Sequence, residues 1–165
     1  MNGLLEDLAR IVFIGIGATA VMDTWLWLLK RMNVPALNFA FIGRWVGHWG
    51  EGKWAHDSIA KAAPVKGELV LGWAVHYAIG IAFAVLLASI YGSSWVNSPR
   101  LLPALAVGIG TVVVPFLVMQ PAMGAGIASS RTLTPLRNCL RTLTNHTVFG
   151  FGLYLAAVFI AWISQ

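Results

Sequence analysis

Charged side chains are scarce in this chain of 165 residues. Only 10% of the residues are Asp, Glu, Lys or Arg, whereas 58% are hydrophobic and the mean hydropathy is +0.76. A soluble domain is usually about one quarter charged, and a fold of this size cannot bury so much apolar surface. The composition therefore excludes an ordinary soluble domain. It predicts a single domain, residues 1–165, embedded in lipid.

Cysteine is also nearly absent, and no secretory signal is evident. Cys139 is the only cysteine, which excludes an internal disulfide and a two-thiol redox mechanism within one chain. Residues 1–10 are acidic ahead of the first apolar run, and no small-residue cleavage site follows, so we expect no signal peptide. The net charge of +5 comes from basic residues beside apolar runs, a pattern of membrane orientation. We therefore expect no nucleic-acid partner.

Four long apolar runs predict transmembrane helices. They cover about residues 11–29, 69–91, 101–122 and 142–164. Each run is about as long as the roughly 20 residues that cross a bilayer as a helix. Pro115 and Pro121 should bend the third helix, and the aromatic spacing within residues 38–49 is typical of a short helix at the membrane interface. The predicted fold is an all-α, polytopic four-helix membrane protein with a short interfacial helix in its first loop.

Lysine and arginine are distributed unevenly between the loops. Of the 11 such residues, Arg10 and Arg100 lie on one predicted side, and the others lie in the loops after the first and third runs. Because cytoplasmic loops are enriched in these residues, we expect both long loops in the cytoplasm and both termini outside. The third loop contains no acid, and its arginines are candidates for binding anionic lipid headgroups. They are Arg131, Arg137 and Arg141.

Each predicted transmembrane helix carries one polar side chain that could meet the others. These are Asp23, His76, Gln120 and His146. A helical rise of 1.5 Å per residue places them at similar depths in the membrane. His76 stands between Gly72 and Gly80 on a stripe of small residues, where another helix can approach closely. We therefore interpret the four residues as an intramembrane polar site, with Asp23 and His76 coupled across the first two helices.

Other interpretations of these residues remain open. Asp23 and His76 could hydrogen-bond only to lock two helices together, Gln120 fits a packing group, and His146 fits an interfacial residue. His76, His146 and Met119 are also candidate metal ligands, because imidazole and thioether groups suit copper(I). The two histidines could alternatively be axial ligands of haem. In the first loop, we expect His48 and His56 to face water or headgroups.

Several segments resemble a known family. They are residues 37–57 (LNFAFIGRWVGHWGEGKWAHD), GELVLGWAVHYAIGIAFA, MQPAMGAGIASSRT and NHTVFGFGLYLAA, together with the early Asp23. In combination they are similar to a family of small bacterial inner-membrane proteins known as domain of unknown function 2938, over nearly the whole chain. The resemblance implies a bacterial inner-membrane location and four spans. It implies no activity, cofactor or catalytic residue.

Three functions of different classes fit the sequence. The first is a small transporter or permeation unit that uses Asp23 and His76 as a proton- or cation-coupled pair, working as a homo-oligomer. The second is a membrane-embedded haem- or metal-binding redox protein. The third is a lipid or protein interaction module whose polar residues only fix the helix packing. We favour the transporter, and the sequence leaves its cargo and any cofactor open.

Overall fold

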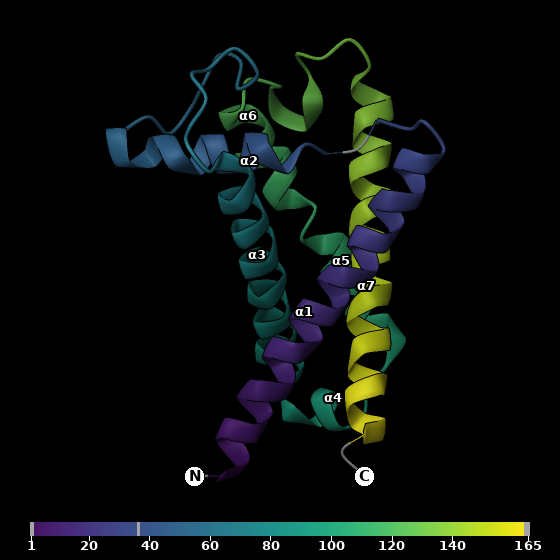
Figure 1. The fold of residues 1–165 in the computed structure, drawn as a ribbon. Coiled ribbons are helices and arrows are strands. Elements are labelled where there is room, and N and C mark those ends of the chain that lie inside the picture. Colours follow the sequence, from purple (N-terminus) through teal and green to yellow (C-terminus); the bar gives the residue numbers. More distant parts are fainter. Residues whose placement is uncertain (1, 36, 164–165) are drawn as a thin grey trace. The chain divides into compact units, whose positions relative to one another are not determined.

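The computed structural model describes residues 2–35 and 37–163. Its regular elements are all helices, and no strand occurs among the described residues (Figure 1). Four helical stretches are long and apolar enough to cross a membrane. They are Leu5–Arg31, Glu68–Tyr91, Leu101–Ala122 and Pro135–Ile163. The predicted all-α fold with four helices of membrane-spanning length is thereby confirmed.

The first and last helices extend beyond their apolar runs. Helix α1 covers Asn2–Arg31 and α7 covers Pro135–Ile163, whereas α3, Glu68–Tyr91, closely matches its run. The last helix begins seven residues before the predicted span, which starts at residue 142. Proline is favoured in the first turn of a helix, because its missing N–H would be unbonded there anyway. The polar segment that follows Pro135 then continues the helix without needing an apolar environment.

The third span is interrupted, as its prolines predict. Helix α5, Leu101–Gly110, ends at a turn, and the π-helical segment η2, Pro115–Met119, and the short α6, Gln120–Ala122, follow. Proline has no N–H to donate to the preceding turn, so Pro115 disrupts the regular hydrogen-bond pattern at this point. The span therefore carries backbone groups that an unbroken helix would have bonded internally.

The first loop contains the predicted short helix. Helix α2, Phe39–Gly47, begins at Asn38, whose side-chain oxygen accepts a hydrogen bond of 3.0 Å from the backbone N–H of Ala40. This bond satisfies one of the N–H groups left free at a helix start. A 3₁₀ turn, η1, His48–Glu51, continues the helix until Gly52 ends it with a φ of 73°. Glycine adopts this left-handed conformation without steric cost.

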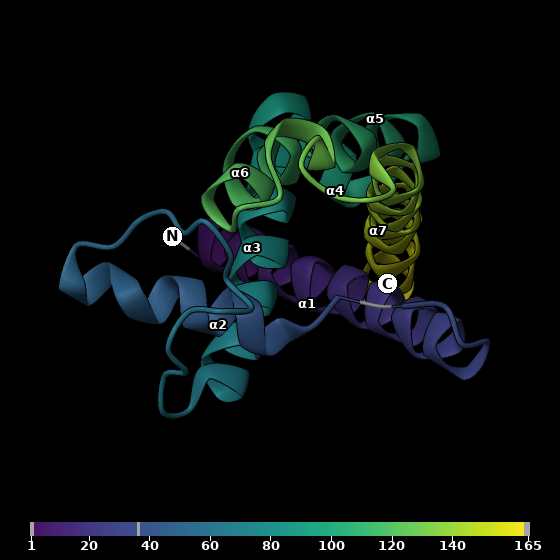
Figure 2. The ribbon, with the colours of Figure 1, turned by 90° about the horizontal axis from the view of Figure 1, so that it is seen from above.

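The residues group into two compact units, which are described separately. Unit 1 consists of Met1–Pro35, Tyr77–Thr111 and Asn145–Gln165, and unit 2 consists of Ala36–His76 and Val112–Thr144. Within unit 1 the spanning helices meet at small residues. A Cβ added to Gly15 of α1 would lie 2.6 Å from Ile81 Cα of α3, and one added to Gly108 of α5 would lie 2.5 Å from Gly150 Cα of α7. Figure 2 shows α5 and α7 side by side.

Unit 2 is built on an equally close backbone approach. A Cβ at Gly43 of α2 would collide with the carbonyl oxygen of Glu68, and one at Gly72 of α3 would collide with that of Phe39. The predicted close approach at Gly72 is therefore confirmed, and the neighbour is the loop helix α2. The remainder of the first loop is bonded to the end of the third span, because the N–H groups of His56 and Ile59 donate to carbonyls at residues 122 and 123.

Candidate functional site

Asp23 of α1 contacts a hydroxyl group of α3. Its Oδ2 accepts a hydrogen bond of 2.9 Å from the phenol of Tyr77, and both residues belong to unit 1. A hydrogen bond to an ionised carboxylate is roughly twice as strong as one between neutral groups. Tyr77 was not among the residues predicted from the sequence, although a phenol directly after His76 in an apolar run was an available signal. The structure therefore gives Asp23 a second titratable group on a neighbouring spanning helix.

His76 lies among aromatic rings in unit 2. It is only 8% exposed, and its ring centroid is 4.5 Å from that of Phe39 and 5.9 Å from that of Trp73. Asp23 belongs to the other unit, so the predicted coupling between Asp23 and His76 stays a prediction. Because Gly72 has no side chain, α2 can approach α3 closely enough for Phe39 to contact the His76 ring.

His146 of α7 is bonded to α5 within unit 1. Its Nδ1 lies 3.0 Å from Thr111 Oγ1 and 3.2 Å from the Gly108 carbonyl oxygen. The Thr111 hydroxyl itself donates to the Gly108 oxygen at 2.7 Å. Because that hydroxyl has only one proton to donate, it must accept from His146, which places a proton on Nδ1. This tautomer leaves Nε2 as the acceptor nitrogen of the neutral ring.

Gln120 connects the third span to the third loop and to α7 within unit 2. Its Oε1 accepts from Ser129 Oγ at 3.0 Å, and its Nε2 donates to Thr142 Oγ1 at 3.3 Å. Thr142 in turn donates to the carbonyl oxygen of Asn138. The carboxamide thus uses both its donor and its acceptor to bridge three segments. This is the bonding pattern of a packing group, the alternative that the sequence left open.

The arginines of the third loop differ in their surroundings. Arg131 and Arg137 are exposed, whereas Arg141 is half-buried. Nη2 of Arg141 is inaccessible to solvent and has no hydrogen-bond partner among the described residues. Binding of lipid headgroups by the three arginines stays a prediction. The same holds for the metal ligands, including Met119, although no three His, Cys, Asp or Glu side chains of the described residues are grouped to hold a metal ion.

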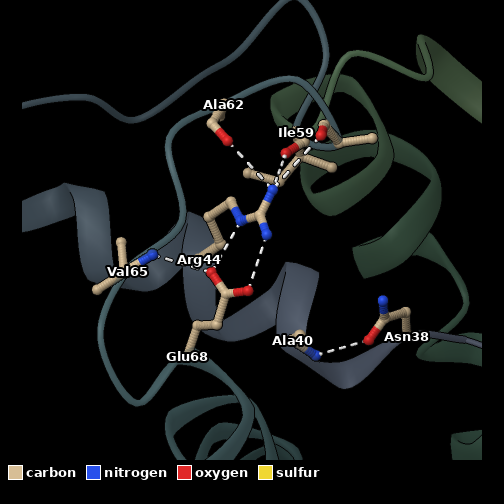
Figure 3. A network of polar contacts seen from close by, with 8 residues as sticks. Asn38, Ala40, Arg44, Ile59, Ala62, Val65 and Glu68 are labelled. Atoms are coloured by element: carbon tan, nitrogen blue, oxygen red, sulfur yellow. Dashed lines mark hydrogen bonds and ion pairs between the residues drawn. The ribbon is translucent and has the colours of Figure 1, made fainter.

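A buried ion pair in unit 2 was not predicted (Figure 3). Arg44 of α2 is 8% exposed, and its Nε and Nη2 each donate to a carboxylate oxygen of Glu68 at 2.8 Å. Its Nη1 donates to carbonyl oxygens of the loop, at 3.1 Å to Ile59 and Ala62 and at 3.4 Å to Ala60. The hydrogen bonds that Arg44 donates to Glu68 raise the pKa of Arg44 above its ordinary value. One guanidinium therefore joins α2, the loop and the start of α3.

Two histidines of the first loop form a pair. His48 Nδ1 lies 2.8 Å from His56 Nε2, and His48 is only 5% exposed. The prediction that His48 faces water or headgroups is wrong, because this end of α2 is covered by the loop that Arg44 holds. The neighbouring Trp49 packs against the rings of Trp45 and Trp54. His56 Nδ1 and Trp49 Nε1 are buried and have no hydrogen-bond partner among the described residues.

The comparisons with known proteins support the resemblance seen in the sequence. A family with the description "Protein of unknown function (DUF2938)" matches residues 12–160. No curated protein and no solved structure matches the chain. The chemistry of the site therefore has to be argued from its own residues. Within the spans these residues offer a carboxyl group with a phenol and an imidazole with a hydroxyl, which are groups that hold and exchange protons.

Proposed function

The chain belongs to the DUF2938 family of proteins of unknown function, and we propose that it is a small transporter or permeation unit of the bacterial inner membrane. The hydrogen bond between Asp23 of α1 and Tyr77 of α3 carries this proposal. Both residues lie in stretches apolar enough to cross a membrane. An ionisable residue there costs about 2.5 to 3.5 kcal/mol on insertion scales, and such residues typically mark ion or proton pathways.

Asp23 is the group that takes up the proton or cation in this proposal. Protonation converts a charge-assisted hydrogen bond from Tyr77 into a neutral one, which is about half as strong. Occupancy of the carboxyl group therefore alters the strength of a contact between α1 and α3. His146, bonded to Thr111, supplies a second proton-holding group within unit 1. His76 is the proposed partner of Asp23 in coupling, whereas Gln120 holds three segments of unit 2 together.

The test is a charge-movement measurement on proteoliposomes adsorbed to a solid-supported membrane. A step in external pH should produce a current in the wild type that Asp23→Asn abolishes and Tyr77→Phe diminishes. Thr24→Val is the matched control, because Thr24 neighbours Asp23 but is exposed and donates only within its own helix, to the Ala20 carbonyl. A wild-type current that is unchanged in Asp23→Asn would contradict the proposal.

The orientation is part of the proposal. Both long loops lie in the cytoplasm and both termini lie outside, because the loops after the first and third spans hold most of the lysines and arginines. Cys139 is the only cysteine, so Cys139→Ser gives a background for labelling. A cysteine at exposed Lys53 should then resist an impermeant maleimide in spheroplasts, and one at exposed Ser93 should react. The reverse pattern would invert the topology.

Two partners belong to the same proposal. Arg131, Arg137 and Arg141 bind anionic lipid headgroups on the cytoplasmic side, and the chain works as a homo-oligomer. Cross-linking in native membranes tests the oligomer.

The absorption spectrum and metal content of the purified protein test the alternative redox function, in which His76, His146 and Met119 bind haem or a metal. A protein that shows no pH-dependent current, haem or metal would instead fit the interaction module.

A further inference from the structure

Unit 1 contains a cavity at the turn between two spans. It has a volume of about 190 Å³ and lies where α3 ends, α4, Ser93–Asn97, turns and α5 begins. It is lined by Tyr91, Ser94, Trp95, Ser98, Arg100 and Pro103. The wall is fixed by hydrogen bonds, since the Trp95 indole donates to the Arg100 carbonyl at 3.0 Å and the Ser94 hydroxyl donates to the Tyr91 carbonyl at 3.2 Å. Trp95 itself is only 5% exposed.

Three of the side chains that line this cavity are exposed and can donate hydrogen bonds to a ligand. They are the Arg100 guanidinium, the Ser98 hydroxyl and the Tyr91 phenol, none of which has a hydrogen-bond partner among the described residues. No acid lines the cavity. The planar fork of a guanidinium matches the oxygens of a phosphate group, and hydroxyls complete such sites as neutral donors. The lining therefore favours an anion over a cation or a neutral ligand.

The size and position of the cavity further restrict which ligands it can bind. Pockets for drug-sized molecules measure roughly 300 to 1,000 Å³, so this one accommodates a single small group. It lies at the ends of two candidate spans, Glu68–Tyr91 and Leu101–Ala122. Tyr and Trp are enriched at that level of a membrane, beside the lipid headgroups. We propose that the cavity binds a phosphate ester, either the headgroup phosphate of an anionic lipid or a small phosphate from solution.

Native mass spectrometry of the delipidated protein tests this proposal. Phosphatidylglycerol is titrated into the wild type, into Arg100→Gln, and into Lys61→Gln, a control with the same charge change at an exposed position of the first loop. We expect Arg100→Gln to retain one lipid fewer per chain than the wild type, because the affinity of this site falls at least about tenfold, and we expect no change in Lys61→Gln. Ser98→Ala removes one neutral donor and leaves the hydrogen bonds that fix the wall intact, so it should lower the affinity less than Arg100→Gln does.

A second measurement separates the two sources of phosphate. Inorganic phosphate is added to the same variants, and the width of its ³¹P resonance reports binding. Broadening that needs Arg100, without retention of phosphatidylglycerol, identifies a soluble phosphate as the ligand, and the opposite result identifies the lipid. The proposal is overturned if neither probe binds. It is also overturned if Arg100→Gln and Lys61→Gln weaken binding equally, since attraction by net charge would then explain the result.

Discussion

Replacing Arg44 by methionine should lower the free energy of unfolding by roughly 3 kcal/mol. The substitution removes two hydrogen bonds of 2.8 Å to Glu68 and two of 3.1 Å to loop carbonyls. Breaking a buried ion pair by removing one partner costs about 3 to 5 kcal/mol, because the other charge is left buried and uncompensated. The side chains of Arg44 and Glu68 are 10% and 17% exposed. The low end of that range therefore applies.

The chain contains a matched control for this prediction. Lys53 and Glu51 form an ion pair at the same N–O distance of 2.8 Å, but their side chains are 62% and 60% exposed. Solvent screens the attraction between such charges, so exposed ion pairs contribute little to the free energy of unfolding. Lys53→Met should therefore leave the free energy of unfolding unchanged. Arg44→Lys keeps the charge but loses the bidentate fork, so its loss of stability should lie between those of the two methionine variants.

Unfolding in mixed micelles with increasing SDS measures these differences. Tryptophan fluorescence is a suitable signal, because Trp45, Trp49 and Trp54 lie in the same loop region as Arg44. The indole of Trp45 also donates to the Trp54 carbonyl at 2.8 Å, so loosening of the loop changes its environment. Equal loss of stability in Arg44→Met and Lys53→Met would refute the reasoning, because burial would then not determine the contribution of the pair.

Two further predictions concern packing and the histidine pair. Gly72→Ala should lower the melting temperature more than Gly110→Ala, because the new Cβ meets the Phe39 carbonyl in the first case and open space in the second; equal melting temperatures would contradict the close approach. His48→Leu should cost about 1 to 3 kcal/mol, because it leaves Nε2 of the half-buried His56 without its hydrogen-bond partner. The double variant with His56→Leu should cost less than the two single losses combined, and additive losses would show that the hydrogen bond contributes nothing.

The sequence predicted the architecture of this protein well, because length and hydropathy alone determine which segments can cross a membrane. It gave no indication of the helical turns that lie outside the apolar runs. Helix α7 begins at Pro135, seven residues before the predicted span, since a polar helical turn has no signal in the hydropathy. The short helix of the first loop was predictable from its aromatic spacing, but its burial was not. The spacing of apolar residues in one helix identifies its apolar face, but it does not identify the segment that covers this face.

The polar side chains within the spans are evident in the sequence, but their hydrogen-bond partners are not. Asp23, Gln120 and His146 stand out because polar groups are rare within apolar runs. Their observed partners follow from the rotation and crossing of packed helices, which the period of one helix does not define. The pair of Arg44 and Glu68 was missed for a related reason. These residues are 24 positions apart, on either side of an irregular loop whose course no periodic pattern predicts.

The hydrogen bonds of Arg44 indicate a structural role, in contrast to the functional role proposed for Asp23. Arg44 makes five hydrogen bonds, two to a carboxylate and three to carbonyls, so its donors are engaged and a ligand would have to displace loop or helix contacts. Loss of Arg44 should therefore affect stability and leave the pH-dependent current of the folded protein unchanged. Asp23→Asn should show the opposite pattern, because the amide keeps an acceptor for Tyr77 but cannot exchange a proton. If Arg44→Lys stays folded yet abolishes the current, the first loop belongs to the transport machinery and this division of roles is wrong.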